Sequence, residues 1–224
     1  MTSIDPSYSQ DPALAVGLPK VDFLGIRNLS ILEDSVRLAK RYQNVDIDIE
    51  NIPLDDKKTF DLLAKGETMG LFQLNGSGMT KYLKDLRPSS IHDINTMVAL
   101  YRPGPIDSIP EYIRRKHDPR LVTYLDPRMK DILGTSYGVI VYQEDVMLTA
   151  INLAGYSWLE ADTLRKAMGK KIPAEMAAQK EKLSKGLIER GMSREKTQKL
   201  WSLIEPFAAY GFNKSHAACY GRVA

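Results

Sequence analysis

Four cations lie within the seven residues RKAMGKK, at positions 165–171, and no acidic residue stands between them. Upstream, Ser157 and Glu160 have the spacing of a helix capping box, and Gly169 suits a helix end, so the run should close a short helix. Cations are favourable there because the helix dipole is negative at its C-terminus. Three of them could converge on a polyanion such as a phosphate group, namely Arg165, Lys166 and Lys170. A solvated cationic helix end without a ligand is the alternative.

A second polar cluster follows a glycine near the end of the chain, in the segment YGFNKSHAACYG at positions 210–221. Its amide, amine, hydroxyl and imidazole groups could hydrogen-bond phosphate, sugar or base edges, and Tyr210 and Phe212 could stack on bases. The polar candidates are Asn213, Lys214, Ser215 and His216. The alternative is the start of a helix that carries polar residues without a ligand.

Arg102 lies in the segment YRPGP, between residues whose backbone has little freedom. An arginine on a rigid turn is pre-organised to bind an anion, because little side-chain and loop entropy remains to be lost. The alternative is a structural role, in which the guanidinium donates hydrogen bonds to nearby carbonyl oxygens.

Two acidic segments contain candidate metal ligands. Asp22 lies in the otherwise apolar stretch VDFLG, where a carboxylate is either a strand-end residue or a ligand of a hard cation such as Mg²⁺. Asp46 and Asp48 would share one face of a strand, as paired metal ligands often do. Pro53 and a further acidic pair follow them, which favours a solvated edge or loop.

The bulk composition excludes several classes of protein. The chain has 224 residues, 43% hydrophobic and 26% charged, which is typical of a soluble globular protein with one large or two small domains. A net charge of only +3 means that any nucleic-acid binding must come from local basic patches. The single cysteine, Cys219, excludes an intrachain disulfide and a cysteine zinc site, and indicates a reducing, cytoplasmic compartment. No apolar run reaches the roughly 18 residues of a membrane span, and the N-terminus lacks the features of a signal peptide.

The elements that would position these residues are mostly helices. Val21–Leu24 and Val139–Tyr142 are predicted as short strands because they are apolar and rich in β-branched or aromatic residues. A capping box at Ser30 and Glu33 places the start of the first helix near Ser30. Later helices are indicated by apolar residues at helical spacing in the ranges 60–63, 79–86, 91–101, 176–187 and 200–207, and by a helix start near residue 144. The predicted fold class is α+β, predominantly α-helical. Because neither end carries a boundary signal, we expect a piece of a longer polypeptide.

Eight segments of the chain are similar, in the same order, to motifs of one known family. They are VDFLGIRNL, IPLDDKKTFDLL, GLFQLNGSGM, ALYRPGP, YGVIVYQEDVM, LAGYS, LRKAMGKK and YGFNKSHAA. The chain thereby resembles the bacterial DNA polymerase III alpha subunits, the C-family replicative polymerases, from about Val21 to Ala224. The resemblance implies the end of the palm in residues 1–30, with its last strand, and part of the fingers in residues 31–224.

The resemblance also implies roles for the candidate residues. Asp22 matches the third catalytic aspartate of the family and would be a ligand of Mg²⁺, of which the complete enzyme is expected to hold two. The cations Arg165, Lys166 and Lys170 match residues of the fingers that meet the triphosphate of the incoming nucleotide. Other positions lining the same pocket match Arg102, Asn213, Lys214 and His216. The first two aspartates of the family form an Asp-x-Asp motif upstream of the xDFLG strand, and Asp46 and Asp48, which lie downstream of it, are not that pair.

The function that the resemblance implies is template-directed addition of deoxynucleotides to a primer 3′ end by two-metal nucleotidyl transfer. The expected partners are primer–template DNA, deoxynucleoside triphosphates and, through regions outside this chain, other replicase subunits such as the sliding clamp. The isolated chain is expected to be inactive, because it lacks two of the three catalytic carboxylates. The alternatives are a non-catalytic module that binds nucleotides or single-stranded DNA, and an error-prone C-family paralogue. The flanking coding sequence would separate the module from the polymerase.

Overall fold

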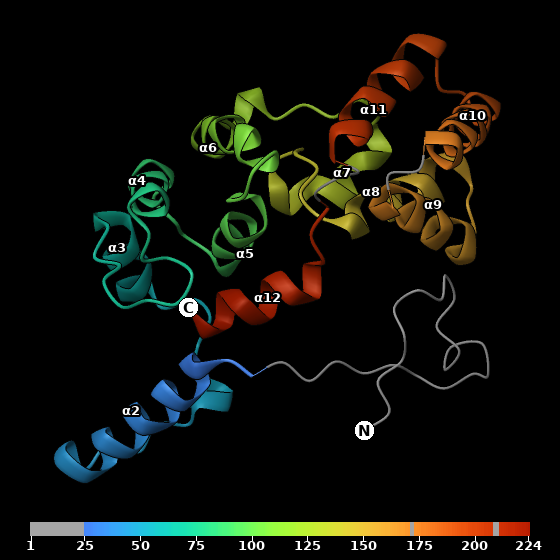
Figure 1. Cartoon of the computed structure of the whole chain (residues 1–224). Helices are drawn as coiled ribbons and strands as arrows, with labels where there is room; N and C mark the ends of the chain where they lie inside the picture. The colour runs from blue at the N-terminus through green and yellow to red at the C-terminus, as the bar shows by residue number, and fades with distance from the viewer. Residues whose placement is uncertain (1–24, 171–172, 208–210) are drawn as a thin grey trace, which may run out of the picture. The chain divides into compact units, whose positions relative to one another are not determined.

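The computed structural model of the chain describes residues 25–170, 173–207 and 211–224 (Figure 1). The chain forms two compact units, Met1–Glu50 and Asn51–Ala224. The predicted strand Val21–Leu24, and with it Asp22, lies outside the described residues.

The described part of the first unit is dominated by one helix, α2 (Arg27–Gln43), none of whose residues is buried. Its start differs from the prediction, because the helix begins three residues before Ser30 and its N-cap, Ile26, makes no side-chain capping bond. The helix ends at Asn44, whose φ of 50° is left-handed. Beyond it, the carboxylate of Asp46 accepts a hydrogen bond from Lys40, and that of Asp48 accepts one from the backbone of Glu50 at 3.1 Å. Both aspartates thus have local partners on a solvated segment, as the sequence indicates.

The second unit is built from helices and their connections. Its α-helices are α3 (Lys57–Lys65), α4 (Ser77–Leu86), α5 (Ile91–Leu100), α6 (Ile109–His117), α7 (Lys130–Leu133), α8 (Gln143–Thr149), α9 (Trp158–Lys170), α10 (Pro173–Glu189), α11 (Arg194–Phe207) and α12 (Lys214–Val223). The described residues also form short helical turns: η1 (Ile49–Asn51), η2 (Pro105–Ser108), η3 (Pro119–Leu121), η4 (Pro127–Met129), η5 (Gly134–Ser136) and the π-helix η6 (Ala150–Ala154). The prediction of a predominantly α-helical chain is confirmed, but the described residues contain no strand that would make the fold α+β.

Local signals in the sequence account for several helix ends. The side chain of Asp56 caps α3 by accepting a hydrogen bond from the Thr59 backbone at 3.0 Å, and α3 stops at Gly66, whose φ is 76°. The predicted capping box before α9 is formed, because Glu160 accepts from the Ser157 backbone at 2.7 Å and Ser157 accepts from the Glu160 backbone at 3.3 Å. Such reciprocal bonds satisfy N–H groups that a helix start leaves unpaired.

The predicted strand Val139–Tyr142 is not formed. Across the described ranges, Tyr142 makes an isolated parallel bridge with Phe212 and no longer ladder follows. The backbone N–H groups of Val141 and Tyr142 instead both donate to the carboxylate of Asp145, each at 2.9 Å. The segment is extended, as its residue types favour, but a side chain takes the place of a neighbouring strand.

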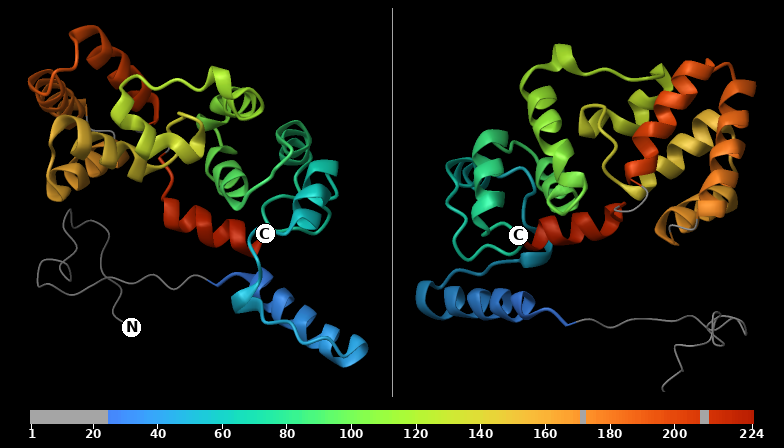
Figure 2. Two further views of the ribbon diagram at one scale, coloured as in Figure 1. Left: turned by 180° about the vertical axis from the view of Figure 1, so that it is seen from behind. Right: turned by 45° about the horizontal axis from the view of Figure 1, so that its top comes forward.

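Two hydrophobic cores organise the second unit. The first core joins α3 to α6 with Val141, Tyr142 and Ala217 of α12. The second core joins α7 to α11, from Met129 to Ile204. Helix α8 belongs to both, because its N-cap Tyr142 is buried in the first core and Val146 is buried in the second. The chain returns at its end to the first core, where α12 lies alongside α5 (Figures 1 and 2).

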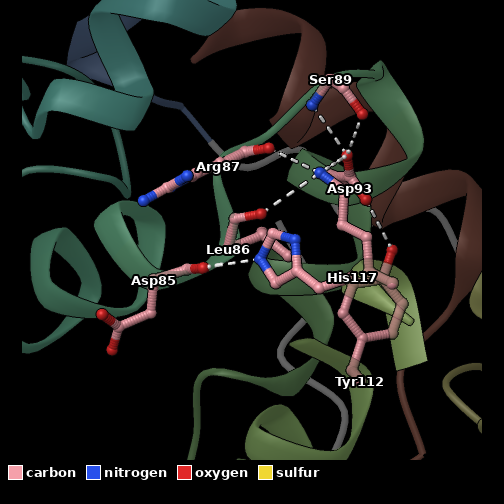
Figure 3. A network of polar contacts seen from close by, with 8 residues as sticks. Asp85, Leu86, Arg87, Ser89, Asp93, Tyr112 and His117 are labelled. Atoms are coloured by element: carbon pink, nitrogen blue, oxygen red, sulfur yellow. Dashed lines mark hydrogen bonds and ion pairs between the residues drawn. The ribbon is translucent and has the colours of Figure 1, made fainter. Parts of the chain in front are cut away.

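A buried ion pair ties the first core together at the start of α5. Asp93 is fully buried, and its carboxylate meets the ammonium of Lys116 from α6 at 2.9 Å. The same carboxylate accepts hydrogen bonds from the Ser89 backbone and the Tyr112 hydroxyl, both at 2.9 Å, with the side chains directed at it from two sides (Figure 3). Lys116 also donates to the carbonyl oxygens of Leu86 and Arg87, at 3.2 and 2.6 Å. Three helices, α4, α5 and α6, thus meet at one satisfied polar centre.

Candidate functional site

The second polar cluster of the sequence forms the start of helix α12. The side-chain oxygen of Asn213 accepts a hydrogen bond from the His216 backbone at 2.8 Å, which makes Asn213 the N-cap of the helix. Asn213, Lys214 and His216 are all exposed, whereas Ala217 turns inward and is fully buried. The helix therefore presents its polar first turn to solvent while the following turn anchors it in the first core.

The first turn of α8, which is distant in the sequence, forms hydrogen bonds with this end of α12. Gln143 donates its backbone N–H to Phe212 O at 3.0 Å and its side-chain amide to Gly211 O at 2.6 Å. Glu144 accepts from the Asn213 side-chain amide at 2.7 Å and from the Lys214 backbone at 2.9 Å. The two motifs YQED and FNKSH thus form one structural unit. No site role was predicted for Gln143 or Glu144, and no local sequence signal connects them to Asn213.

Arg102 joins the same unit through an aromatic contact. Its guanidinium carbon lies 4.1 Å from the centre of the Phe212 ring, which is the geometry of a cation–π interaction. Its Nε atom is buried and has no hydrogen-bond partner among the described residues, and burial lowers the pKa of this guanidinium. The structural alternative for Arg102, bonds to nearby carbonyl oxygens, is not what the described residues show. The turn that carries Arg102 is closed by Gly104 at a φ of 97°.

Aromatic rings continue the unit along α12. The His216 ring lies between Phe212 and Tyr220, with centroids 5.2 and 4.1 Å away. Tyr220 in turn meets Phe72 at 5.0 Å. The ammonium of Lys214 lies 5.5 Å from the centre of the Tyr142 ring. Cationic and aromatic groups are thus interleaved on a partly exposed surface, a pattern that suits bases and phosphates.

The cationic run lies elsewhere, on α9 in the second core. Both Arg165 and Lys166 pair with Asp162 one turn earlier, at 2.7 and 2.8 Å. Hydrogen bonds from Lys166 and Arg165 lower the pKa of the Asp162 carboxyl. Sequence reasoning missed Asp162, although its spacing of three and four residues from the two cations is that of helical ion pairs. Lys170 is the last residue of α9, and its side chain lies outside the described part of the structure.

The predicted site residues therefore fall into two groups. Arg102 and His216 contact the Phe212 ring, and Asn213 and Lys214 lie beside them at the start of α12; these four residues form the α12 site. Arg165 and Lys166 form the α9 site. Within residues 25–170, 173–207 and 211–224, no hydrogen bond, ion pair or ring contact joins the two sites. The same residues contain no group of three side chains placed to hold a metal ion.

A cleft of about 890 Å³ opens between α6 and α11, apart from both sites. Its floor includes the buried side chains of Met129 and Leu133, and Lys196 and Lys199 stand at its α11 wall. None of the predicted site residues lines it. The volume is within the range of ligand pockets, but the cleft and the candidate residues do not coincide.

Comparison with known proteins identifies the family. Residues 28–191 match the family model described as the bacterial DNA polymerase III alpha subunit finger domain. A DNA polymerase III subunit alpha of Thermus aquaticus is 46% identical over 218 residues, which are 95% of this chain and 18% of that protein. The proteins of the same name from Staphylococcus epidermidis and Halalkalibacterium halodurans are 44% and 47% identical, over 100% and 93% of this chain and 21% and 19% of their own lengths.

The chain thus spans about a fifth of the length of these curated relatives. Among the described residues, no helix is long and apolar enough to cross a membrane. The family match covers helices α2 to α10 and so includes the α9 site, while the relatives' similarity extends over the α12 site as well. The chain belongs to the family of bacterial DNA polymerase III alpha subunits and carries their finger domain.

Proposed function

We propose that this chain is the end of the palm and part of the fingers of a replicative DNA polymerase, and that its two cationic sites bind the incoming deoxynucleoside triphosphate. In the complete enzyme the reaction is the addition of deoxynucleotides to a primer 3′ end, on primer–template DNA. Residues 1–30 then form the end of the palm, and residues 31–224 form part of the fingers. The observation that carries the proposal is the contact of Arg102 and His216 with the Phe212 ring, beside Lys214 in the first turn of α12.

The α12 site has unused capacity for a ligand. The buried Nε–H group of Arg102 lacks an acceptor among the described residues, and an unsatisfied buried donor is costly unless a ligand completes it. A phosphate or base oxygen would supply that acceptor. Lys214 adds a second positive charge, and the partly exposed rings of Phe212 and His216 offer faces on which a base or sugar can pack.

The α9 site suits phosphate groups because its present partner is weak. The Asp162 carboxylate and the side chains of Arg165 and Lys166 are 31%, 37% and 60% exposed, and such solvated ion pairs contribute little to stability. A triphosphate carries more charge than one carboxylate and offers oxygens on several sides. Exchange of Asp162 for phosphate oxygens on Arg165 and Lys166 would therefore cost little. Lys170 is proposed to act with them.

We propose that Asp22 binds Mg²⁺ in the complete enzyme, where the metal would stabilise charge on the reacting oxygens and phosphates. The described residues do not by themselves form a metal site. No step through the metal is therefore assigned to them. The part proposed for the described residues is to bind and orient the nucleotide, which lowers the entropic cost of bringing it to the primer end.

Steady-state kinetics on the full-length parent enzyme test this function. Arg102→Ala, Lys214→Ala and Arg165→Ala should each raise KM for the deoxynucleotide, because each removes a charge-assisted contact of roughly 1.5–3 kcal/mol, or about ten- to a hundredfold in affinity. The effect at Lys214 should be the most sensitive to salt, because Lys214 is exposed whereas Arg102 and Arg165 are partly buried.

The controls are Lys196→Ala and Lys199→Ala on α11, which change the same charge on an exposed surface away from both sites. They should leave KM unchanged. If all five variants gave the same KM as the wild-type enzyme, the two cationic sites would have no part in nucleotide binding. The isolated chain should not extend a primed template, because it lacks two of the three expected carboxylates.

A further inference from the structure

We propose that Glu144 is a positioning residue for the α12 site, which it holds in the geometry that binds the nucleotide. The inference rests on the proposed function of that site. It concerns a residue with no hydrogen bond or ion pair to Arg102 among the described residues. Its carboxylate reaches the site through Asn213 and Lys214 alone, at 2.7 and 2.9 Å.

The base of this contact is rigid. Glu144 lies in the first turn of α8, whose N-cap Tyr142 is buried in the first core with 5% exposure. The neighbouring Asp145 is 2% exposed and holds the Val141 and Tyr142 backbone N–H groups at 2.9 Å. The residues that flank Glu144 are therefore held in place by burial and hydrogen bonds. A residue that orients another one needs such a rigid backbone.

The element that Glu144 holds is fixed only in part without it. Helix α12 is anchored by Ala217 and Gly221, which are buried against the first core and α5. Its first turn, with Asn213 and Lys214, is exposed and precedes those anchors. Both oxygens of Glu144 are used to fix this turn, one on the amide of Asn213 and one on the backbone of Lys214.

A positioning role and a simple charge effect of Glu144 predict opposite changes in nucleotide affinity when the carboxylate is removed. A carboxylate beside a triphosphate site repels the ligand, so removal of the charge alone would strengthen nucleotide binding. If Glu144 acts by holding Asn213 and Lys214, its removal weakens binding instead. Glu144→Gln keeps the size of the side chain and removes the charge, and therefore tests which effect is larger.

A reciprocal exchange tests the geometry directly. In Glu144→Gln an amide N–H group faces the amide of Asn213, and one hydrogen bond is lost. In Asn213→Asp two carboxylates face each other, although aspartate still caps the helix well. In the double variant the new amide at position 144 can donate to the new carboxylate at position 213, and its oxygen can still accept from the Lys214 backbone. The bonds are restored with donor and acceptor exchanged.

The experiment is a double-mutant cycle in the full-length parent enzyme, with KM for deoxynucleotide, kcat and the Kd for primer–template DNA as readouts. Each single variant should raise KM about two- to tenfold, which corresponds to one lost hydrogen bond, with kcat and the DNA Kd unchanged. The double variant should return KM to within about twofold of the wild-type value. Glu111→Gln removes another partly exposed carboxylate, on α6, and should leave KM unchanged.

A KM for Glu144→Gln that is equal to or below the wild-type value would overturn the inference, as would a double variant no better than the product of the two singles. Lys214→Ala separates this failure from failure of the proposed function. If Lys214→Ala raises KM and Glu144→Gln does not, only the positioning role is wrong. If neither raises it, the α12 site does not bind the nucleotide and both proposals fall.

Discussion

Replacement of Lys116 by methionine should destabilise the chain more than removal of a surface lysine. The Lys116 side chain is only 8% exposed, and its ammonium lies 2.9 Å from the fully buried carboxylate of Asp93. Two further hydrogen bonds, to the carbonyl oxygens of Leu86 and Arg87, are lost in Lys116→Met. The carboxylate would keep its contacts with Ser89 and Tyr112 but would have no countercharge within this centre.

The magnitude follows from what remains after the change. Removal of one partner of a buried pair leaves an uncompensated charge and typically costs about 3–5 kcal/mol. For a chain of this size, 1 kcal/mol changes the melting temperature by about 2–4 °C, so Tm should fall by roughly 6–20 °C. Addition of Asp93→Asn should recover about half of the loss, because the amide oxygen can still accept from Ser89 while the buried charge is gone.

Thermal and urea unfolding at pH 7, followed by circular dichroism, measure these differences. Lys199→Met is the matched control, since it makes the same substitution on an exposed position of α11. Its free energy of unfolding should lie within about 0.5 kcal/mol of the wild-type value. A loss of less than about 1 kcal/mol in Lys116→Met would show that solvent or another cation compensates Asp93, and the reasoning from burial would be refuted.

Three further predictions concern other parts of the molecule. Burial raises the pKa of Asp145 to about 6, above its ordinary value of 3.8, so its contribution to stability is complete below pH 3.8 and is lost as the pH rises through 6. Asp145→Asn should flatten the change in urea midpoint between pH 4 and pH 7, and an unchanged slope would contradict the assignment. Gly221→Ala should cost about 1–3 kcal/mol in urea unfolding, because the new methyl group would overlap the side-chain oxygen of Asn95, and Asn95→Ala should relieve it. In the parent enzyme, Asp22→Asn should abolish primer extension but not DNA binding, whereas Asp48→Asn should be silent in both assays. Equal damage from the two would show that the wrong aspartate was chosen.

Much of the fold could be predicted because its signals are local. The N-cap at Asp56, the capping box at Ser157 and the helix end at Gly66 each depend on residues within a few positions of one another. The predicted start of α2 was wrong. The capping-box spacing of Ser30 and Glu33 also occurs inside a helix, and α2 begins earlier, at Arg27, without a capping side chain. The conformation of Val139–Tyr142 depends on tertiary contacts. Its β-branched residues favour extended backbone, but the described residues provide no partner strand for it.

The candidate residues could be chosen from the sequence, but their arrangement could not. Nothing near Asn213 in the sequence indicates that Glu144 will be its partner, because a contact across about 70 residues depends on the packing of the whole core. The contact of Arg102 with Phe212 has the same origin. Asp162 is different, since its spacing from Arg165 and Lys166 is a local signal that could have been used.

The packing of α12 against α5 has a consequence for synthesis on the ribosome. More than a hundred residues separate the end of α5 from the start of α12, and at about 5–20 residues per second they take roughly six to twenty seconds to emerge. The buried residues of the second core that the structure describes all lie between Met129 and Ile204. It can therefore be completed first, although the first core begins earlier in the chain. During that interval the apolar surface of α5 that later packs against α12 is exposed. Chaperones can bind it and so prevent non-native contacts.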